Sequence, residues 1–330
     1  MPTLVTADLH LAENPRDAYR LAFFDQLPAL AREYDADRVL VLGDITEAKD
    51  GHRATLVNRI VDGFAALAEV AQVYVLLGNH DYVSIDVPFY RFLHHLPRVR
   101  WIAEPTALKL RGLGDCLFLP HTRDVGAWTT LMGQKYAWYF CHQTFGGADL
   151  GHGQLAKAGA APFTRKAGDR VVSGDVHVPQ QLGAVTYVGS PYTIDFGDDF
   201  DPRILLLDGT EMLSVPTEGP QKVLVEVPRR HGPASRAPHA GDIVKVRVEL
   251  PPNSDRSRTD VRAEWRAWAG RMGVELYTVQ VVSPEAGAST PKARLRHRAP
   301  DADLVRAYVK KMGKGKVTAA AGLKIVEEVP

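Results

Sequence analysis

The sequence predicts an α/β fold with two packed sheets, helices on the outside, and a smaller α+β domain at the C-terminal end. Three observations lead to this prediction. Apolar strands alternate with helix-period segments over residues 3–77, which is typical of a parallel layered start. Further short apolar strands follow as far as residue 207. A strand, an amphipathic helix and a second strand then span residues 243–282.

Composition indicates a globular chain with ample core. Of its 330 residues, 45% are hydrophobic, and no apolar run approaches the roughly 20 residues that a membrane span needs. No basic segment precedes an apolar stretch at the N-terminus, so we expect no signal peptide. The two cysteines, Cys116 and Cys141, lie in apolar strand-like surroundings. We expect both to be reduced core residues of a cytoplasmic protein.

The spacing of apolar residues and the positions of prolines predict the first helices and strands. Asn14-Pro15 favours a helix start, because proline suits the first helical position. Apolar residues then recur at helical spacing, and Pro28 predicts a kink or an early end. A second helix is expected over residues 56–67, between apolar strands at 38–42 and 73–77.

The third of these strands ends in Gly78-Asn79-His80-Asp81. The strand is apolar on both faces, and ligands of open α/β sheets bind at the carboxyl ends of such strands. Asparagine offers a neutral oxygen, and histidine a nitrogen ligand or a proton. An aspartate can fix the orientation of an imidazole. This stretch is therefore a candidate site.

Four other predicted strands also end in residues that bind metals. A single aspartate after a strand is usually a helix cap or turn former, but five such ends in one chain indicate a shared metal site. The candidates at the five ends are Asp8 and His10; Asp44; Asn79, His80 and Asp81; His142; and Asp175 and His177.

In order, these residues resemble the calcineurin-like metallophosphoesterase superfamily, whose pattern is D-x-H, G-D, G-N-H-D, a lone H and G-H-x-H. The resemblance covers residues 1–215, with Asp175 standing where the family usually has histidine. The segments 140–145 and 189–197 are similar to the SbcD-type DNA-repair exonuclease branch and its phage-encoded relatives. The resemblance implies a four-layer αββα sandwich.

The resemblance also implies a dinuclear metal centre. In that pattern Asp44 bridges two ions; Asp8, His10 and His177 complete one site, and Asn79, His142 and Asp175 complete the other. His80, steadied by Asp81, would protonate the leaving oxygen, and no protein nucleophile is needed. Carboxylate, imidazole and carbonyl ligands suit Mn²⁺, with Mg²⁺ as the alternative.

A polar loop at the same sheet edge follows Asp44. Its basic residues Lys49, His52 and Arg53 are candidates for contacts with a substrate phosphate. The alternative is an ordinary helix-entry loop whose charges face solvent.

Charge is distributed unevenly along the chain. Residues 216–330 contain 21 Lys and Arg against 13 Asp and Glu, a net charge of +8, whereas residues 1–215 contain 19 against 26, a net charge of −7. A basic half indicates a polyanionic partner, with a solvated charged surface as the alternative. The strongest basic cluster is Lys292, Arg294, Arg296, His297 and Arg298.

The tryptophans at 265 and 268 are interpreted as core residues rather than a base-stacking platform.

These observations predict three segments: a catalytic domain at 1–215, a Pro-rich linker at 216–241 and a basic α+β accessory domain at 242–330. The function hypothesis is a dinuclear-metal phosphodiesterase, namely a DNA exonuclease or endonuclease of the SbcD-like type. The alternative is a phosphoesterase that acts on nucleotides or another small phosphoester. The expected partners are DNA, an SMC-like ATPase and a second copy of the chain, and no membrane.

Overall fold

The computed structural model describes residues 1–49, 51–84, 87–124, 135–151, 153–157, 170–227, 237–251 and 254–282. Residues 1–249 and 256–281 form one compact unit, and residues 250–255 and 282–330 belong to a second. The basic cluster at 292–298 lies outside the described residues.

The first sheet has six strands in the order β14-β13-β1-β2-β3-β6. Four are parallel, and β13 and β14 extend the sheet antiparallel on one side. The strands are β1 (Thr3–Thr6), β2 (Arg38–Leu42), β3 (Gln72–Leu76), β6 (Val99–Ile102), β13 (Arg203–Asp208) and β14 (Glu211–Pro216). The predicted alternation of strands and helices is therefore confirmed, because β1, β2 and β3 are parallel neighbours.

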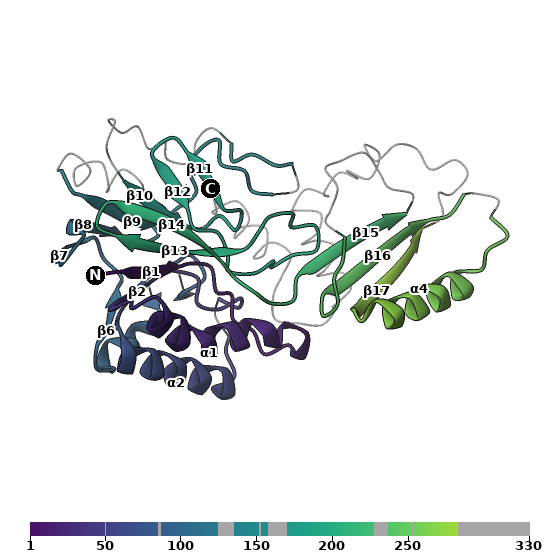
Figure 1. Ribbon diagram of the computed structural model, residues 1–330, viewed down its shortest axis with the longest axis horizontal. Helices are drawn as coiled ribbons and strands as arrows, with labels where there is room; N and C mark the ends of the chain where they lie inside the picture. The colour runs from purple at the N-terminus through teal and green to yellow at the C-terminus, as the bar shows by residue number, and fades with distance from the viewer. Residues whose placement is uncertain are drawn as a thin grey trace, which may run out of the picture. The chain divides into compact units, whose positions relative to one another are not determined.

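Helices α1 (Ala18–Glu33) and α2 (Ala54–Val70) lie together on the outer face of this sheet (Figure 1). A short 3₁₀ turn, η1 (Pro15–Asp17), leads into α1, and the Asn14 side chain caps it by accepting a hydrogen bond from Arg16 N. Pro28 lies inside α1, so the predicted early end of this helix is wrong. The helices bury an apolar face against the sheet, with Phe24 and Phe64 in edge-to-face contact.

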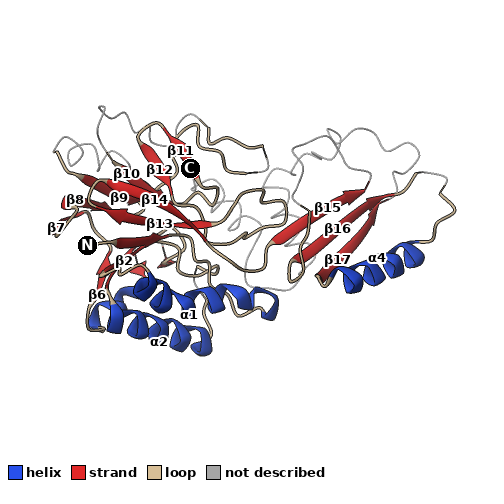
Figure 2. Cartoon of the chain, in the orientation of Figure 1, coloured by secondary structure: helices blue, strands red, loops and turns tan. Residues whose placement is uncertain are grey.

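The second sheet also has six strands, in the order β11-β12-β10-β9-β8-β7. They are β7 (Thr106–Leu110), β8 (Gly114–Leu119), β9 (Trp138–His142), β10 (Val171–Gly174), β11 (Gln180–Leu182) and β12 (Val185–Tyr187). One apolar cluster joins side chains of both sheets, such as Val5 and Leu40 with Phe118, Phe140 and Val172. The two sheets therefore pack face to face, as the sandwich prediction requires (Figure 2).

Two short elements follow β3. Strands β4 (Tyr82–Ser84) and β5 (Val87–Pro88) pair antiparallel, and the 3₁₀ helix η2 (Tyr90–His95) leads to β6. The outer face of the second sheet is packed by Phe145, Ala148 and Ala156, which belong to the segment after β9. Both cysteines are free and buried, as the composition predicted.

The C-terminal part contains a three-stranded sheet in the order β15-β16-β17 and helix α4. The elements are β15 (Lys222–Val227), β16 (Ile243–Glu249), α4 (Arg258–Met272) and β17 (Glu275–Val282). The Ser257 side chain caps α4 by accepting from Asp260 N, and Gly273, at φ 68°, ends it. Strand β15 lies inside the predicted linker and pairs parallel with β16, so part of that segment belongs to this sheet.

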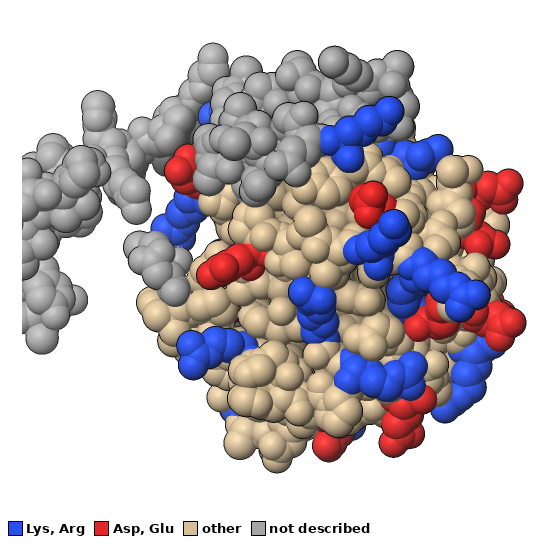
Figure 3. Space-filling model, turned by 90° about the vertical axis from the view of Figure 1, so that its left-hand side faces the viewer, with Lys and Arg blue, Asp and Glu red and all other residues tan. Residues whose placement is uncertain are grey.

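None of the described helices combines the length and the apolarity that crossing a bilayer requires. Lys and Arg side chains alternate with Asp and Glu on the face seen in Figure 3. That face therefore carries no large patch of a single charge sign.

Candidate active site

The candidate residues lie at the carboxyl ends of strands from both sheets. The ends of β1, β2 and β3 meet the ends of β9 and β10, because the two sheets pack against each other. Three overlapping groups each bring their donor atoms within 4.8 Å of one another: Asp8, His10 and His177; His10, Asp44 and His80; and Asp8, Asp44 and His142. Residues from five strand ends thus form one cluster.

Asp44 lies at the centre of this cluster. Its Oδ2 is 3.5 Å from His10 Nε2, and its Oδ1 is 3.3 Å from His142 Nε2, so each oxygen faces a different imidazole. Burial raises the pKa of Asp44, but His142, His10 and His80 outweigh this and hold the pKa well below its ordinary value. The carboxylate is therefore ionised and placed where a bridging ligand would lie.

The first donor group consists of Asp8, His10 and His177. The Nε2 atoms of His10 and His177 are 3.1 Å apart, and the Asp8 carboxylate completes the group. Asp8 Oδ1 accepts a hydrogen bond from Asp175 N, while its buried Oδ2 has no hydrogen-bond partner. Burial lowers the pKa of His10 well below its ordinary value, which favours the neutral imidazole that a metal requires.

The second donor group forms around His142. His142 Nδ1 donates to the Leu42 carbonyl at 2.6 Å, which leaves Nε2 facing Asp44 and, at 3.6 Å, Asp175 Oδ1. The other oxygen of Asp175 accepts a hydrogen bond of 2.6 Å from the Thr144 hydroxyl. This contact aims one carboxylate oxygen at the group, as a ligand replacing the usual histidine would require.

We expect Asp175→Asn to weaken one metal site about tenfold or more, because it removes a charge but keeps the side-chain shape. Metal titration by calorimetry measures this, with the site of Asp8 and His10 still filled. The control is Asp149→Asn, since Asp149 Oδ1 only accepts from Gly151 N in an exposed turn. Two ions bound with undiminished affinity would show that Asp175 merely turns the chain.

Buried atoms without partners show that these residues fit divalent cations. Asp8 Oδ2, Asn79 Oδ1 and His142 Nε2 are all buried and have no hydrogen-bond partner. Burying such atoms unsatisfied is costly, and cations held by the two donor groups would satisfy them. The donors are carboxylates, an amide and imidazoles, a set that suits Mn²⁺ and Mg²⁺.

Backbone conformation also marks this site. Asp8, His10, Asp44 and Asp175 all have positive φ angles, of 53°, 41°, 55° and 78°. Only two other non-glycine residues in the described ranges share this conformation. Side chains rarely adopt it without a functional or structural constraint, so the strand ends are bent to aim these donors.

Glycines before the donors allow a close approach. A Cβ atom at Gly78 would come within 2.3 Å of Asp44 Oδ1, and one at Gly43 within 2.3 Å of His142 Nδ1. No side chain fits at either position. The glycines of the G-D and G-N-H-D motifs are thus required by contact with the donors themselves.

The predicted pairing of His80 with Asp81 is wrong. The Asp81 carboxylate accepts from the backbone N–H groups of Gly78, Asp44 and Ile45, at 2.7, 3.0 and 2.9 Å. His80 Nδ1 instead donates to the Glu47 carbonyl at 2.8 Å. Asp81 therefore holds the two motif loops together, and Glu47 orients the imidazole.

The three candidates for phosphate contact lie outside the donor groups. Lys49 is exposed, and Arg53 is an exposed residue whose Nε lies 3.6 Å from Glu13 Oε2. The His52 ring packs against Phe89, with 4.4 Å between ring centroids. Contacts of these three residues with a substrate stay a prediction.

Arg20, a buried arginine of α1, is a further residue of the site that sequence did not predict. Its Nη1 donates to the His10 carbonyl at 2.7 Å and to Glu47 Oε2 at 2.8 Å, and its Nη2 donates to the Ile194 carbonyl at 3.3 Å. Glu47 Oε2 is also 3.6 Å from His10 Nδ1. Arg20 therefore joins the loops that carry His10 and Glu47. Its helical position gave no motif by which sequence could find it.

We expect Arg20→Gln to reduce metal affinity about 10- to 100-fold, because it frees the loop of a candidate ligand. Calorimetric metal titration measures this change. Arg38→Gln is the matched control, since Arg38 is equally buried but bonds Thr3 Oγ1 and the Met1 carbonyl at the amino end of β2. Both changes should lower stability by about 3 kcal/mol. Equal metal affinities in the two variants would contradict a positioning role for Arg20.

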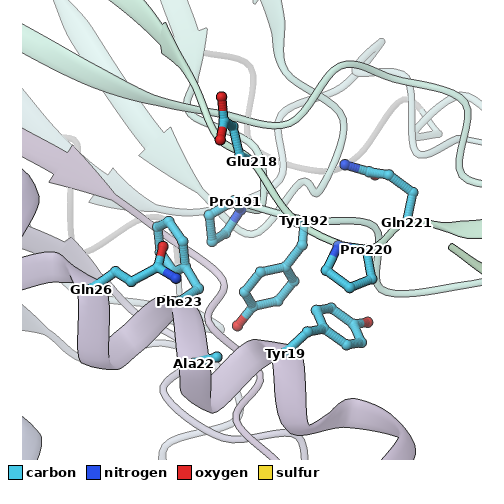
Figure 4. A pocket seen from close by; sticks show the side chains of 10 residues that line it. Tyr19, Ala22, Phe23, Gln26, Pro191, Tyr192, Glu218, Pro220 and Gln221 are labelled. Atoms are coloured by element: carbon cyan, nitrogen blue, oxygen red, sulfur yellow. The ribbon is translucent and has the colours of Figure 1, made fainter. Parts of the chain in front are cut away.

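A small cavity of about 60 Å³ lies between α1 and the segments around Tyr192 and Pro220 (Figure 4). Tyr192 stands at its wall between Tyr19 and Phe23 of α1, and its hydroxyl donates to the Leu9 carbonyl. The cavity holds no more than a few waters, so it is not a substrate site. Its aromatic wall supports the loop between Asp8 and His10.

Comparison with known proteins identifies the fold family. The model of the calcineurin-like phosphoesterase family matches residues 1–179, more than half of the chain. The chain belongs to this family. It is a metal-dependent phosphoesterase, in a family whose members bind two divalent ions, and the candidate ligand residues are present.

Similarity to individual proteins is more limited. Over 90 residues the chain is 34% identical to the SbcD subunit of the nuclease SbcCD from Escherichia coli (strain K12), a match that covers 26% of this chain and 22% of that protein. Among solved structures, a dimetal phosphatase from Danio rerio is 10% identical, with a TM-score of 0.40 over 66% of this chain and 99% of that one. The nuclease MPE of Pseudomonas putida is 16% identical, with a TM-score of 0.32 over 64% and 87%.

Proposed function

We propose that this phosphoesterase is a DNA nuclease of the SbcD-like type that uses two Mn²⁺ ions, with Mg²⁺ as the alternative. The observation that carries the phosphodiesterase chemistry is Asp44, whose two oxygens face the imidazoles of two separate donor groups. The preference for DNA is supported by the local identity to a nuclease subunit and by the net charge of +8 on residues 216–330.

The donor residues divide between two cation positions. Asp8, His10 and His177 would hold one ion and Asn79, His142 and Asp175 the other, with Asp44 shared. Bound there, such ions supply Lewis-acid polarisation of the phosphoryl group and a more acidic water. The chain holds the donors in place through Asp81, which fixes the backbone of both motif loops.

His80 is the proposed proton donor. Its Nδ1 hydrogen is committed to the Glu47 carbonyl, so Nε2 is the ring nitrogen left to face a substrate. The imidazole lies against His10, with 4.8 Å between ring centroids, and is half-buried beside the donor cluster. From that position, in its imidazolium form with a proton on both nitrogens, it would protonate the leaving oxygen of a cleaved phosphodiester and be left as the neutral ring.

A substrate panel tests the proposal. Single- and double-stranded DNA, RNA, cyclic nucleotides and bis(p-nitrophenyl) phosphate are each incubated with Mn²⁺ and with Mg²⁺. We expect cleavage of DNA and of the generic phosphodiester, with more activity in Mn²⁺ and none in chelator. Efficient turnover of cyclic nucleotides without DNA cleavage would contradict the nuclease proposal and favour a small phosphoester substrate.

Partners and location extend the same proposal. We propose DNA as substrate, with an SMC-like ATPase and a second copy of the chain as partners; the local match to one subunit of a nuclease supports the existence of a protein partner. The proposed accessory domain, residues 242–330, would help to hold DNA. Two free, buried cysteines support a reducing cytoplasmic location.

A further inference from the structure

We propose that helix α4 and the strand ends beneath it bind single-stranded DNA, with a base in a tryptophan-lined groove and phosphates on arginines. The inference rests on the proposed nuclease function and names the form of DNA that the chain holds. It depends on three features: two partly exposed tryptophans, a groove beside them, and the arginines that line this groove.

The tryptophans of α4 are not the core residues that the sequence predicted. Only Val261 and Ala269 of this helix are fully buried, while Trp265 and Trp268 remain partly exposed. Their rings meet edge to face, with 4.9 Å between centroids. Large aromatic rings that stay partly exposed offer a face for stacking.

A groove of about 480 Å³ opens beside these rings. Its apolar wall consists of Trp265, Trp268, Val227 and Val248, at the ends of β15 and β16. Arg256 and Arg271 lie at its rim with Glu264. An apolar, aromatic groove with cations at its rim suits a planar base that carries a phosphate.

The charge of α4 favours an anion over an apolar protein segment. Arg256 is paired with Glu264, but Arg271 has no acidic partner among the described residues. The same holds in that part of the chain for three further exposed arginines: Arg258, Arg262 and Arg266. Positions 256–272 thus contain five arginines and only two acidic residues, Asp260 and Glu264.

Helix geometry decides which arginines accompany the groove. An α-helix turns by about 100° per residue, so Arg258, Arg262 and Arg266 form a row on the flank of α4 away from the groove. The phosphate contacts therefore fall to Arg256 and Arg271, whose side chains line the groove itself. Base faces are hidden inside a duplex but free in a single strand, so the groove selects single strands.

The test is binding of a fluorescein-labelled 15-nucleotide oligothymidylate, measured by anisotropy in chelator so that cleavage plays no part. We expect Trp268→Leu to weaken binding about 10- to 100-fold and Trp268→Phe to retain most of it, because phenylalanine still stacks. Arg256→Gln and Arg271→Gln together should reduce the slope of log affinity against log salt by about 1.4, since each single-strand phosphate contact contributes about 0.7.

The matched control replaces two exposed arginines far from α4 in the chain: Arg32→Gln and Arg91→Gln. It makes the same charge change and should leave the salt slope as it was. Equal affinity of the α4 variants and this control, or tighter binding of a duplex of the same length, would overturn the proposal. All variants should hydrolyse bis(p-nitrophenyl) phosphate normally, so failure of the nuclease proposal would show separately in the substrate panel.

Discussion

Replacing Asp44 with asparagine is expected to lower phosphodiester hydrolysis by more than about a thousandfold. The substitution removes the one charge that faces both donor groups, and with it the affinity for both ions. Metal ions contribute several kcal/mol to transition-state stabilisation, and each 1.36 kcal/mol is a factor of ten in rate. Asparagine is chosen over alanine because it tolerates the φ of 55° at this position. Steady-state rates and metal stoichiometry by mass spectrometry or calorimetry measure both losses.

Asp35→Asn is the matched control for this variant. Asp35 has a φ of 52°, close to that of Asp44, but it lies just after α1 and away from the donor cluster. It tests whether exchanging aspartate for asparagine in this backbone conformation matters by itself. Full activity of Asp44→Asn would refute the dinuclear assignment as a whole.

His80→Ala is expected to lower turnover about 100- to 10,000-fold while both ions remain bound. A positioned proton donor accounts for a factor of this size. The backbone N–H of His80 donates to Asp44 Oδ1 at 2.8 Å, and alanine keeps that contact. The loop around Asp44 should therefore stay in place, and the loss should appear in kcat rather than in metal affinity.

One outcome of this experiment would reassign His80 from proton donor to metal ligand. A nitrogen of its ring lies within 4.8 Å of donor atoms of His10 and Asp44, close enough for His80 to act as a ligand. If His80→Ala binds one ion fewer, then His80 holds metal and is not the acid. His95→Ala, at an exposed histidine of η2, controls for the loss of an imidazole.

Sequence predicted the parts of this site that depend on local order. A strand followed at once by a donor residue fixes that donor at a sheet edge, so the cluster of Asp8, Asp44 and His142 could be anticipated. The role of Asp81 could not, because its contacts with Asp44 N and Ile45 N join loops that are far apart in the chain. Adjacency in sequence suggested His80 as its partner instead.

Other features depended on packing that periodicity does not determine. Arg20 has the spacing of an ordinary helical residue, and only the folded loops place its guanidinium on the His10 carbonyl. The helix pattern of α4 suggested that its tryptophans face the core, whereas a sheet of only three strands leaves them partly uncovered. The strand β15 was hidden in a Pro-rich segment because its partner, β16, begins only at Ile243, beyond the prolines.

The pairing of β1 determines how short a working fragment can be. Thr3 pairs with Arg38 on one side and with Leu207 on the other. A fragment ending at residue 179 would contain every candidate donor, yet β1 would keep an open edge of unpaired backbone groups. Open edges recruit other chains and promote aggregation, during synthesis as well as in purified fragments. The smallest fragment that folds by itself must therefore extend through β13, well past the last candidate metal ligand.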